Sequence, residues 1–214
     1  MIRLLVVDDH EVVRDGVKSL FDAQPGAVLG DAGTAAEALR LVSDQNWDVV
    51  VLDLSLGGKN GLDVLKELKQ IRPRLPVLIL SMHSEEQYAR RAFRAGASGY
   101  ITKDSSRVEL FSAIEKIRAG GKYVSAGLAE RLVVYFEAEV DASPQELLSD
   151  REFEVMRLIA SGKTVSEIAE LLGLSGKTVS TYRARLLEKM GMRTNAELTH
   201  YALHKKLVDV EDLG

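Results

Sequence analysis

The first half of the chain alternates short apolar runs with longer stretches in which apolar residues recur every three or four positions. Three of the runs are almost continuously apolar, as is typical of strands covered on both faces. The stretches between them have helical periodicity. Strands are predicted over residues 3–8, 27–32, 47–53, 75–81 and 98–102. This alternation predicts an α/β fold with a doubly wound, five-stranded parallel sheet.

Helix start signals support the same alternation. In a capping box, a hydroxyl and a carboxylate three residues apart bind the free N–H groups of the first turn. Thr34 with Glu37 and Ser106 with Glu109 have this spacing. The helix expected over residues 106–119 would place four apolar residues on one face: Val108, Phe111, Ile114 and Ile117.

From about residue 123 the strand pattern ends and helical patterns follow. Residues 124–139 are expected to form one helix, and residues 140–147, which contain the breaker Pro144, an exposed linker. Four more helical patterns come next, of which the third follows Ser175 as an N-cap. The other three begin with capping-box pairs: Ser149 with Glu152, Thr164 with Glu167, and Thr194 with Glu197. We therefore expect a small all-α four-helix domain after the linker.

The composition narrows the classes of protein that fit. The chain has 214 residues, of which 46% are hydrophobic and 28% charged, as in ordinary globular proteins. It contains no cysteine, which excludes disulfides and thiolate chemistry and fits a reducing cytosol. Its apolar runs are shorter than the roughly 20 residues of a membrane span. The start of the chain turns acidic too early for a signal peptide. We therefore expect a cytoplasmic protein that does not bind membranes.

The net charge of −4 conceals an uneven distribution. Residues 123–148 hold five acidic residues and one basic residue, whereas residues 177–193 hold five basic residues and one acidic residue, Glu188. A local basic patch can bind nucleic acid even in an acidic protein. The total charge therefore does not exclude DNA as a partner.

Polar residues follow the predicted strands at their carboxyl ends, where open parallel sheets bind ligands. Clustered carboxylates repel one another unless a cation lies among them, and oxygen ligands suit Mg²⁺. A carboxylate can attack phosphorus, while a lysine and a hydroxyl bind the phosphoryl oxygens. Each of these residues alone would more often be a solvated strand end, but five together favour a site. The set is Asp8, Asp9, Asp53, Ser81 and Lys103.

Residues 164–191 have the pattern of a helix-turn-helix. Gly173 permits a left-handed turn and Ser175 caps the second helix, expected over residues 176–190. Val179, Leu186 and Met190 share one stripe of that helix and are expected to face the core. The helix pair alone fits an exposed basic helix in a bundle equally well. The candidate contacts with the major groove are Lys177, Thr178, Ser180, Thr181, Arg183, Ala184 and Arg185.

Residues 1–122 resemble the receiver domain of two-component response regulators. The similarity lies in "LLVVDDHEVVR", "VVLDLSL", "NGLDVL", "LILSMH" and "GASGYITKD", which occur in the family's order. The resemblance implies that Asp53 accepts a phosphoryl group and that Ser81 and Lys103 bind it. It also implies the sheet order 2-1-3-4-5.

The same resemblance implies a Mg²⁺ ion and a conformational switch. Asp9 would bind the ion directly and Asp8 mainly through water, with Asp53 and the backbone carbonyl of Ser55 as further ligands. Tyr100 matches the family's switch aromatic; without the family it would be read as an ordinary strand tyrosine. One position departs from the family, because Gly57 stands where a proline is usual. We therefore expect a distorted turn at Gly57 and Gly58.

Residues 147–203, "LLSDREFEVMRLIASGKTVSEIAELLGLSGKTVSTYRARLLEKMGMRTNAELTHYAL", resemble the LuxR-type DNA-binding domain. Together the two resemblances identify the chain as similar to NarL/FixJ-type response regulators, which are bacterial. They imply a sensor histidine kinase or phosphotransfer protein as partner. They also imply dimers on phosphorylation or DNA binding, made through a helix at about residues 195–206. The expected domains are a receiver over residues 1–122, a linker over 123–147 and a DNA-binding domain over 148–214.

The expected function is a DNA-binding transcriptional regulator controlled by phosphorylation, not an enzyme that turns over an external substrate. An aspartate-dependent phosphatase is an alternative, but such enzymes need a second carboxylate two residues after the nucleophile, where this chain has Ser55. A second alternative is a DNA-binding protein that acts independently of phosphorylation and uses its first domain only to dimerise.

Overall fold

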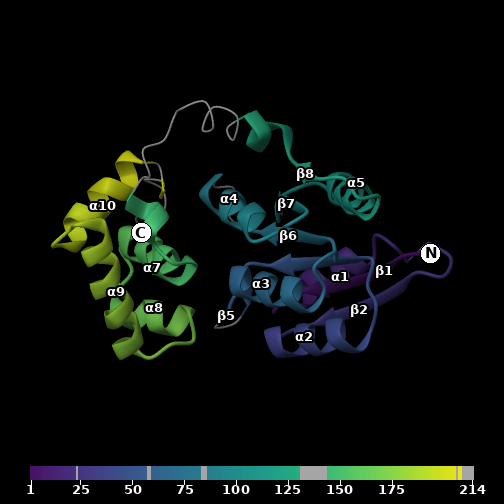
Figure 1. Cartoon of the computed structure of the whole chain (residues 1–214), viewed down its shortest axis with the longest axis horizontal. Coiled ribbons are helices and arrows are strands. Elements are labelled where there is room, and N and C mark those ends of the chain that lie inside the picture. The colour runs from purple at the N-terminus through teal and green to yellow at the C-terminus, as the bar shows by residue number, and fades with distance from the viewer. Residues whose placement is uncertain (23, 57–58, 83–85, 131–143, 206, 209–214) are drawn as a thin grey trace. The chain divides into compact units, whose positions relative to one another are not determined.

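The computed structural model describes residues 1–22, 24–56, 59–82, 86–130, 144–205 and 207–208. The chain divides into two compact units, Met1–Glu137 and Ala138–Gly214. Figure 1 shows the strands gathered in the first unit and helices alone in the second. Within the described residues, no helix is both long and apolar enough to cross a membrane.

The first unit is built on a parallel sheet. Its neighbouring strands pair in parallel in the order β2-β1-β3-β6-β7-β8. The five predicted strands are thus present in the predicted order, and the short β8 extends the edge beside β7. The strands are β1 (Arg3–Val7), β2 (Val28–Ala32), β3 (Val49–Asp53), β6 (Val77–Ser81), β7 (Gly99–Thr102) and β8 (Tyr123–Val124).

Five helices alternate with the strands and cover the sheet (Figure 1). They are α1 (Glu11–Lys18), α2 (Ala35–Asp44), α3 (Gly61–Ile71), α4 (Glu86–Arg94) and α5 (Arg107–Arg118). A further antiparallel pair, β4 (Ser55–Leu56) and β5 (Lys59–Asn60), lies between β3 and α3. The expected doubly wound fold is therefore confirmed.

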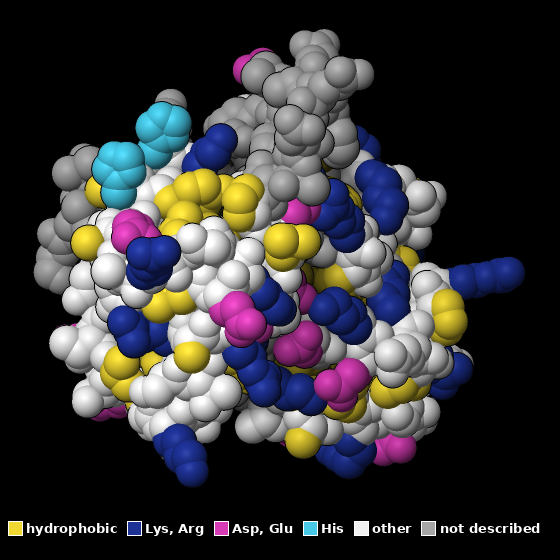
Figure 2. Space-filling view, turned by 60° about the vertical axis from the view of Figure 1, so that its left-hand side comes forward, with side chains coloured by type: hydrophobic (Ala, Val, Ile, Leu, Met, Phe, Trp, Pro, Cys, Tyr) yellow, Lys and Arg dark blue, Asp and Glu magenta, His cyan; other side chains and the backbone are white. Residues whose placement is uncertain are grey.

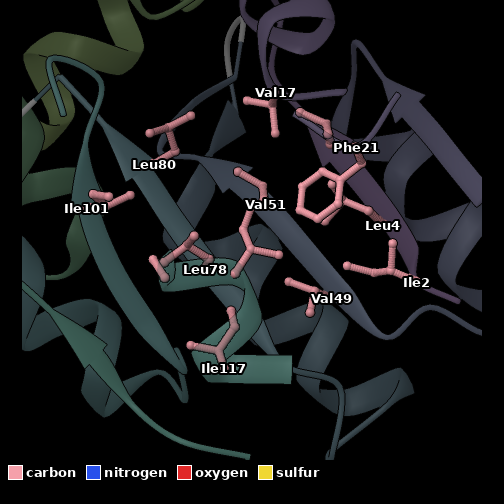
Figure 3. Packing of buried hydrophobic residues seen from close by; sticks show 13 residues of the cluster. Ile2, Leu4, Val17, Phe21, Val49, Val51, Leu78, Leu80, Ile101 and Ile117 are labelled. Atoms are coloured by element: carbon pink, nitrogen blue, oxygen red, sulfur yellow. The ribbon is translucent and has the colours of Figure 1, made fainter. Parts of the chain in front are cut away.

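Alternate residues of the strands point to opposite faces of the sheet, so each face has its own core. On one face, Leu4, Val51 and Leu78 pack with residues of α1 and α5. Figure 3 shows these side chains together with Phe21 and Ile117 in one continuous cluster. Burial of both faces explains the almost continuous apolar runs in the sequence.

Two expectations for this unit were wrong. Strands do not end at residue 123, because Tyr123 and Val124 form β8; the helical residues that follow are 126–130, and residues 131–143 lie outside the described part. Val108 is 80% exposed and does not share the buried face of Ile114 and Ile117. A helix turns about 100° per residue, so three steps of three residues rotate a position by about 180°. Val108 and Ile117 therefore point in opposite directions.

The second unit is helical. It begins with the 3₁₀ helix η1 (Pro144–Leu147), followed by α7 (Asp150–Ala160), α8 (Val165–Leu171), α9 (Gly176–Met190) and α10 (Asn195–His204). The side chain of Gln145 in η1 is buried and accepts a hydrogen bond from the hydroxyl of Tyr201 in α10. Arg157 in α7 donates from Nε to the carbonyl oxygen of Leu207 at 2.9 Å. These contacts attach η1 and Leu207 to the helical core. The expectation of an exposed linker over residues 140–147 is therefore wrong for η1, and residues 140–143 lie outside the described part.

The expected capping boxes are complete at two of five helix starts. Both reciprocal hydrogen bonds are present at Ser149 with Glu152 and at Thr164 with Glu167. At the other three starts the hydroxyl accepts its backbone N–H as predicted. Their carboxylates instead accept from groups outside the cap: Glu37 from the Gly33 N–H, Glu109 from the Tyr123 hydroxyl, and Glu197 from the Arg193 N–H.

Candidate functional site

A cluster of polar side chains, called the acidic pocket below, lies at the carboxyl edge of the parallel sheet. Asp8 follows β1, Asp53 ends β3, Ser81 ends β6 and Lys103 follows β7, so four neighbouring strands each deliver one side chain. Asp8, Asp53 and Ser81 are 1%, 2% and 1% exposed. Buried charged and polar groups of this kind are unusual unless they are paired or functional.

Lys103 connects the two buried carboxylates. Its Nζ lies 2.9 Å from Oδ2 of Asp53 and 2.7 Å from Oδ2 of Asp8. The backbone N–H of Lys103 donates to the carbonyl oxygen of Ser81 at 2.8 Å, which ties the loop after β7 to the end of β6. One ammonium therefore offsets the repulsion between two carboxylates that β1 and β3 hold at the same edge.

Asp9 and His10 complete the pocket on its open side. Ligand atoms of Asp8, Asp9, His10 and Asp53 lie within 4.8 Å of one another. His10 Nδ1 is 2.8 Å from Asp9 Oδ1 and 3.2 Å from Asp8 Oδ1. The three carboxylates supply the oxygen donors that Mg²⁺ prefers, so the residues fit that ion. His10 was not predicted, although its place directly after Asp9 was the available signal.

The pocket raises the pKa values of both Asp53 and Lys103, for different reasons. Burial raises the pKa of the Asp53 carboxyl, and the charge of Asp8 raises it further, against the hydrogen bond from Lys103. Burial lowers the pKa of Lys103, but its contacts with Asp8 and Asp53 outweigh this and hold that pKa above the usual value. Lys103 thus remains charged, and an added cation would favour the ionised, nucleophilic form of Asp53.

The loop after Asp53 approaches the start of α3 closely. Gly61 donates its N–H to the Leu54 carbonyl at 2.8 Å, and a Cβ at Gly61 would lie 2.4 Å from the Asp53 carbonyl oxygen. Only glycine permits this approach. Asn60 caps the helix by accepting the N–H of Leu62 at 2.9 Å. The expected distortion at Gly57 and Gly58 lies outside the described residues.

Two further predicted residues lie near this edge in different environments. Ser55 is exposed in β4, where it pairs with Asn60. Tyr100 in β7 is fully buried and pairs in register with Ile79 of β6. It points to the face opposite that of Ile101 because neighbouring strand residues alternate.

The second candidate site is the helix-turn-helix formed by α8 and α9. Gly173 has the expected left-handed conformation, with φ of +60°, and the N–H of Leu174 returns to the Ala169 carbonyl at 2.8 Å. Ser175 caps α9 by accepting the N–H of Thr178 at 3.1 Å. The predicted turn chemistry is therefore present.

The predicted inner and outer faces of α9 are confirmed. Val179, Leu186 and Met190 are buried, as is Leu187. Of the candidate DNA contacts, five are exposed and two, Thr178 and Arg183, are partly buried. The exposed five are Lys177, Ser180, Thr181, Ala184 and Arg185.

Local hydrogen bonds constrain several of these candidates. The hydroxyl of Ser180 donates to the Gly176 carbonyl, and that of Thr181 to the Lys177 carbonyl, both at 2.9 Å. In this geometry their oxygens remain available as acceptors only. Arg183 donates from Nε to Oδ1 of Asn195 at 2.7 Å, which links α9 to α10.

A hollow of about 260 Å³ lies on α9 between basic side chains. It is lined by Lys177, Thr178, Thr181, Tyr182 and Arg185. Tyr182 was not predicted; its position between Thr181 and Arg183 was the only signal. Figure 2 shows that Lys and Arg side chains on the face turned to the viewer are interspersed with acidic and uncharged ones.

Comparisons with known proteins match both units. Residues 4–115 match the model of the response regulator receiver domain, and residues 146–202 match that of the LuxR family of bacterial regulatory proteins. Response regulator UvrY of Escherichia coli (strain K12) is 34% identical over 216 residues, covering 100% of this chain and 99% of UvrY. Response regulator GacA of Pseudomonas viridiflava is 36% identical over 211 residues, covering 98% and 99%.

Solved structures of response regulators are also similar to this chain. A LuxR-family two-component response regulator from Aurantimonas sp. SI85-9A1 is 38% identical, with a TM-score of 0.60, and covers 64% of this chain and 98% of that one. RcsB of Salmonella typhimurium, at 24% identity, shares the fold, with a TM-score of 0.66 over 94% of this chain and 96% of that one.

Proposed function

Because the chain belongs to the NarL/FixJ-type response regulators, DNA-binding transcription regulators with a receiver and a LuxR-type domain, we propose that phosphorylation of Asp53 controls its binding to double-stranded DNA. The observation that carries this proposal is the contact of Lys103 Nζ with both Asp53 and Asp8 inside a buried pocket. A solvated strand end would not require an ammonium shared between two buried carboxylates.

In the proposed reaction, a carboxylate oxygen of Asp53 attacks the phosphorus of a phosphohistidine. The P–N bond breaks, the histidine nitrogen leaves with its electron pair, and an acyl phosphate forms on Asp53. The donor is a sensor histidine kinase or a phosphotransfer protein. Lys103 Nζ, already beside Asp53, would bind a phosphoryl oxygen, and the Ser81 hydroxyl would donate a hydrogen bond to another.

Mg²⁺ is the proposed cofactor, held by Asp8, Asp9, Asp53 and the backbone carbonyl of Ser55. When bound, it neutralises negative charge on the carboxylates and the phosphoryl group. The chain itself contributes the strand ends that bring these residues together. It also contributes the loop after Asp53, which the Gly61 N–H holds against the start of α3. We propose that the acyl phosphate is lost slowly by hydrolysis and that no external substrate is turned over.

The acyl phosphate carries about −1.5 to −2 charges where the Asp53 carboxylate carried one, in a pocket that also holds the carboxylates of Asp8 and Asp9. We propose that the Ser81 hydroxyl moves toward it and that the buried Tyr100 of β7 changes its packing in response. The receiver surface so altered would favour dimers. The proposed receiver spans residues 1–122, the linker 123–147 and the DNA-binding domain 148–214.

The proposed DNA contacts lie on the exposed side of α9, which would enter the major groove. Lys177, Arg183 and Arg185 would neutralise phosphates. Ser180 and Thr181 would accept hydrogen bonds from base edges, and Ala184 would contact a thymine methyl group. Thr178, which is partly buried beside the N-cap residue Ser175, would approach the sugar-phosphate backbone of the DNA. RcsB, which is similar in fold, has been solved as a complex with DNA, and this supports DNA as the partner.

The phosphoryl acceptor is tested by incubating the protein with acetyl phosphate and Mg²⁺ and measuring intact mass. The wild type is expected to gain one phosphoryl group, and Asp53→Asn none. Asp63→Asn, which removes a carboxylate of α3 paired with Lys66 at 3.5 Å outside the pocket, serves as the matched control and should gain it normally. Equal phosphorylation of Asp53→Asn, or none in the wild type, contradicts the proposal.

A further inference from the structure

A cavity of about 570 Å³ lies at the amino edge of the sheet, opposite the acidic pocket. Its walls come from the end of α2 and the segment leading into β3, and from the end of α3 and the segment leading into β6. These segments meet because β3 and β6 are neighbouring parallel strands. The same strands end at Asp53 and Ser81 on the other edge, so the two sites are separate.

The walls of the cavity are mainly apolar. A volume of roughly 300–1,000 Å³ with apolar walls and few polar groups is typical of small-molecule sites. Trp47, the single tryptophan of the chain, is one of the lining residues and is nearly buried. Ile71, by contrast, is partly exposed at the mouth. The apolar lining is Val42, Trp47, Ile71, Pro73, Leu75 and Pro76.

The Trp47 ring is held in place without help from a ligand. Its Nε1–H donates to the Leu41 carbonyl at 3.1 Å, and the Arg3 guanidinium lies 5.5 Å from the ring centroid. Gly30 in β2 makes room for it, because a Cβ there would lie 2.4 Å from the ring. The indole therefore presents a fixed, preformed apolar wall with its polar N–H already satisfied.

The charged residues that line the cavity are both basic. Arg72 and Arg74 line the cavity, and its described lining contains no Asp or Glu. Arg72 is turned toward α2, with its guanidinium nitrogens 3.4 Å and 3.5 Å from the carbonyl oxygens of Val42 and Ser43. For the exposed Arg74, no hydrogen bond or ion pair is found within the described residues. Arg74 is therefore the cation available to a ligand.

We propose that this cavity binds a small amphiphilic anion, with an apolar ring or branched body against Trp47 and one carboxylate or sulfonate on Arg74. Guanidinium pairs well with a planar carboxylate, and the apolar walls exclude a more highly charged ligand such as a nucleotide. The inference does not depend on phosphorylation of Asp53.

The test uses the full chain and two dyes that share one apolar body. 1-Anilinonaphthalene-8-sulfonate carries the anion, and N-phenyl-1-naphthylamine is its uncharged analogue. Either dye beside Trp47 quenches tryptophan emission by energy transfer. We expect saturable 1:1 quenching by both dyes, with tighter binding of the sulfonate.

Substitutions separate the anion site from the apolar wall. Arg74→Gln should weaken the sulfonate dye about tenfold, the effect of losing one charged hydrogen bond, and leave the neutral dye unchanged. Ile71→Asn should weaken both dyes. Arg40→Gln is the matched control, because this exposed arginine of α2 pairs with Asp44 at 3.6 Å and does not line the cavity.

Three results overturn the proposal. Absence of saturable quenching by either dye excludes the site. Equal affinity for the two dyes in the wild type indicates a purely apolar occupant. Equal loss of the sulfonate dye in Arg74→Gln and Arg40→Gln indicates general charge attraction. Thermal unfolding of each variant confirms that the fold is retained, as expected for exposed positions.

Discussion

The acidic pocket and the outer face of α9 use charge in opposite ways. In the pocket, Asp8 and Asp53 are buried and depend on one shared ammonium, Lys103. On α9, Lys177 and Arg185 are exposed to solvent. Buried charges interact strongly because little water screens them, whereas exposed charges act nearly independently and weaken in salt. The pocket should therefore respond as a unit, and the helix residue by residue.

Lys103→Met should have the largest effect. It leaves two carboxylates facing each other, and loss of one partner of a buried ion pair costs about 3 kcal/mol of unfolding free energy. Urea denaturation measures this loss. Lys66→Met, the matched control, removes an exposed partner of Asp63 and should cost less than about 1 kcal/mol.

The double variant Lys103→Met with Asp53→Asn tests whether the pocket is a unit. It should recover much of the lost stability, because only one buried carboxylate remains charged. Simple addition of the two single effects would show that the pocket residues act independently, contrary to the comparison.

Lys177→Ala should have a smaller effect, confined to DNA binding. Removing one phosphate contact lowers the magnitude of the slope of log affinity against log salt concentration by about 0.9. It also weakens binding to the specific site and to unrelated DNA by a similar factor. Fluorescence anisotropy across a salt series measures the slope. Lys205→Ala, at an exposed lysine after α10, is the control; an unchanged slope in Lys177→Ala rules out a phosphate contact.

Arg183→Ala tests whether a basic residue of α9 acts only on DNA binding or also on the packing of the domain. Its Nε is bound to Asn195, so part of its effect should come from the contact between α9 and α10. Asn195→Ala should therefore reproduce that part, seen as a lower thermal stability without a change in salt slope. A slope change in Asn195→Ala equal to that in Arg183→Ala would contradict this division.

The pH dependence of Asp53→Asn should be the smallest effect. The pKa of Asp53 is raised in the folded protein by burial and Asp8, so protonation favours folding. Its contribution to stability is present below the unfolded pKa of about 3.9 and is lost as pH rises through the folded pKa. Without divalent cations, Asp53→Asn should therefore gain stability over wild type as pH rises toward neutrality. If the stability of Asp53→Asn relative to the wild type instead grew as pH falls, the raised pKa of Asp53 would be contradicted.

The sequence predicted those features that depend on periodicity and strand ends. Asp53 and Lys103 could be placed together because parallel strands deliver their last residues to one edge. Val179 and Leu186 could be placed inside because both lie on one helical stripe. These features follow from sequence periodicity and from the general geometry of parallel sheets.

Other features depend on tertiary neighbours and could not be predicted. The two-residue strand β8 carries no periodic signal, and Glu109 accepts from Tyr123 only once β8 is in place. His10 joins the carboxylates through the direction of its ring, which sequence spacing does not fix. The cavity beside Trp47 exists because two segments, separated in the sequence, enter adjacent strands.

The central claim is that phosphorylation of Asp53 controls DNA binding. The most direct measurement is genome-wide recovery of DNA bound by the wild type and Asp53→Asn, each with and without acetyl phosphate and Mg²⁺. We predict that phosphorylation increases recovery of a defined set of sites by the wild type and leaves Asp53→Asn unchanged. Equal recovery under all four conditions would contradict the account and favour a protein whose DNA binding is independent of phosphorylation.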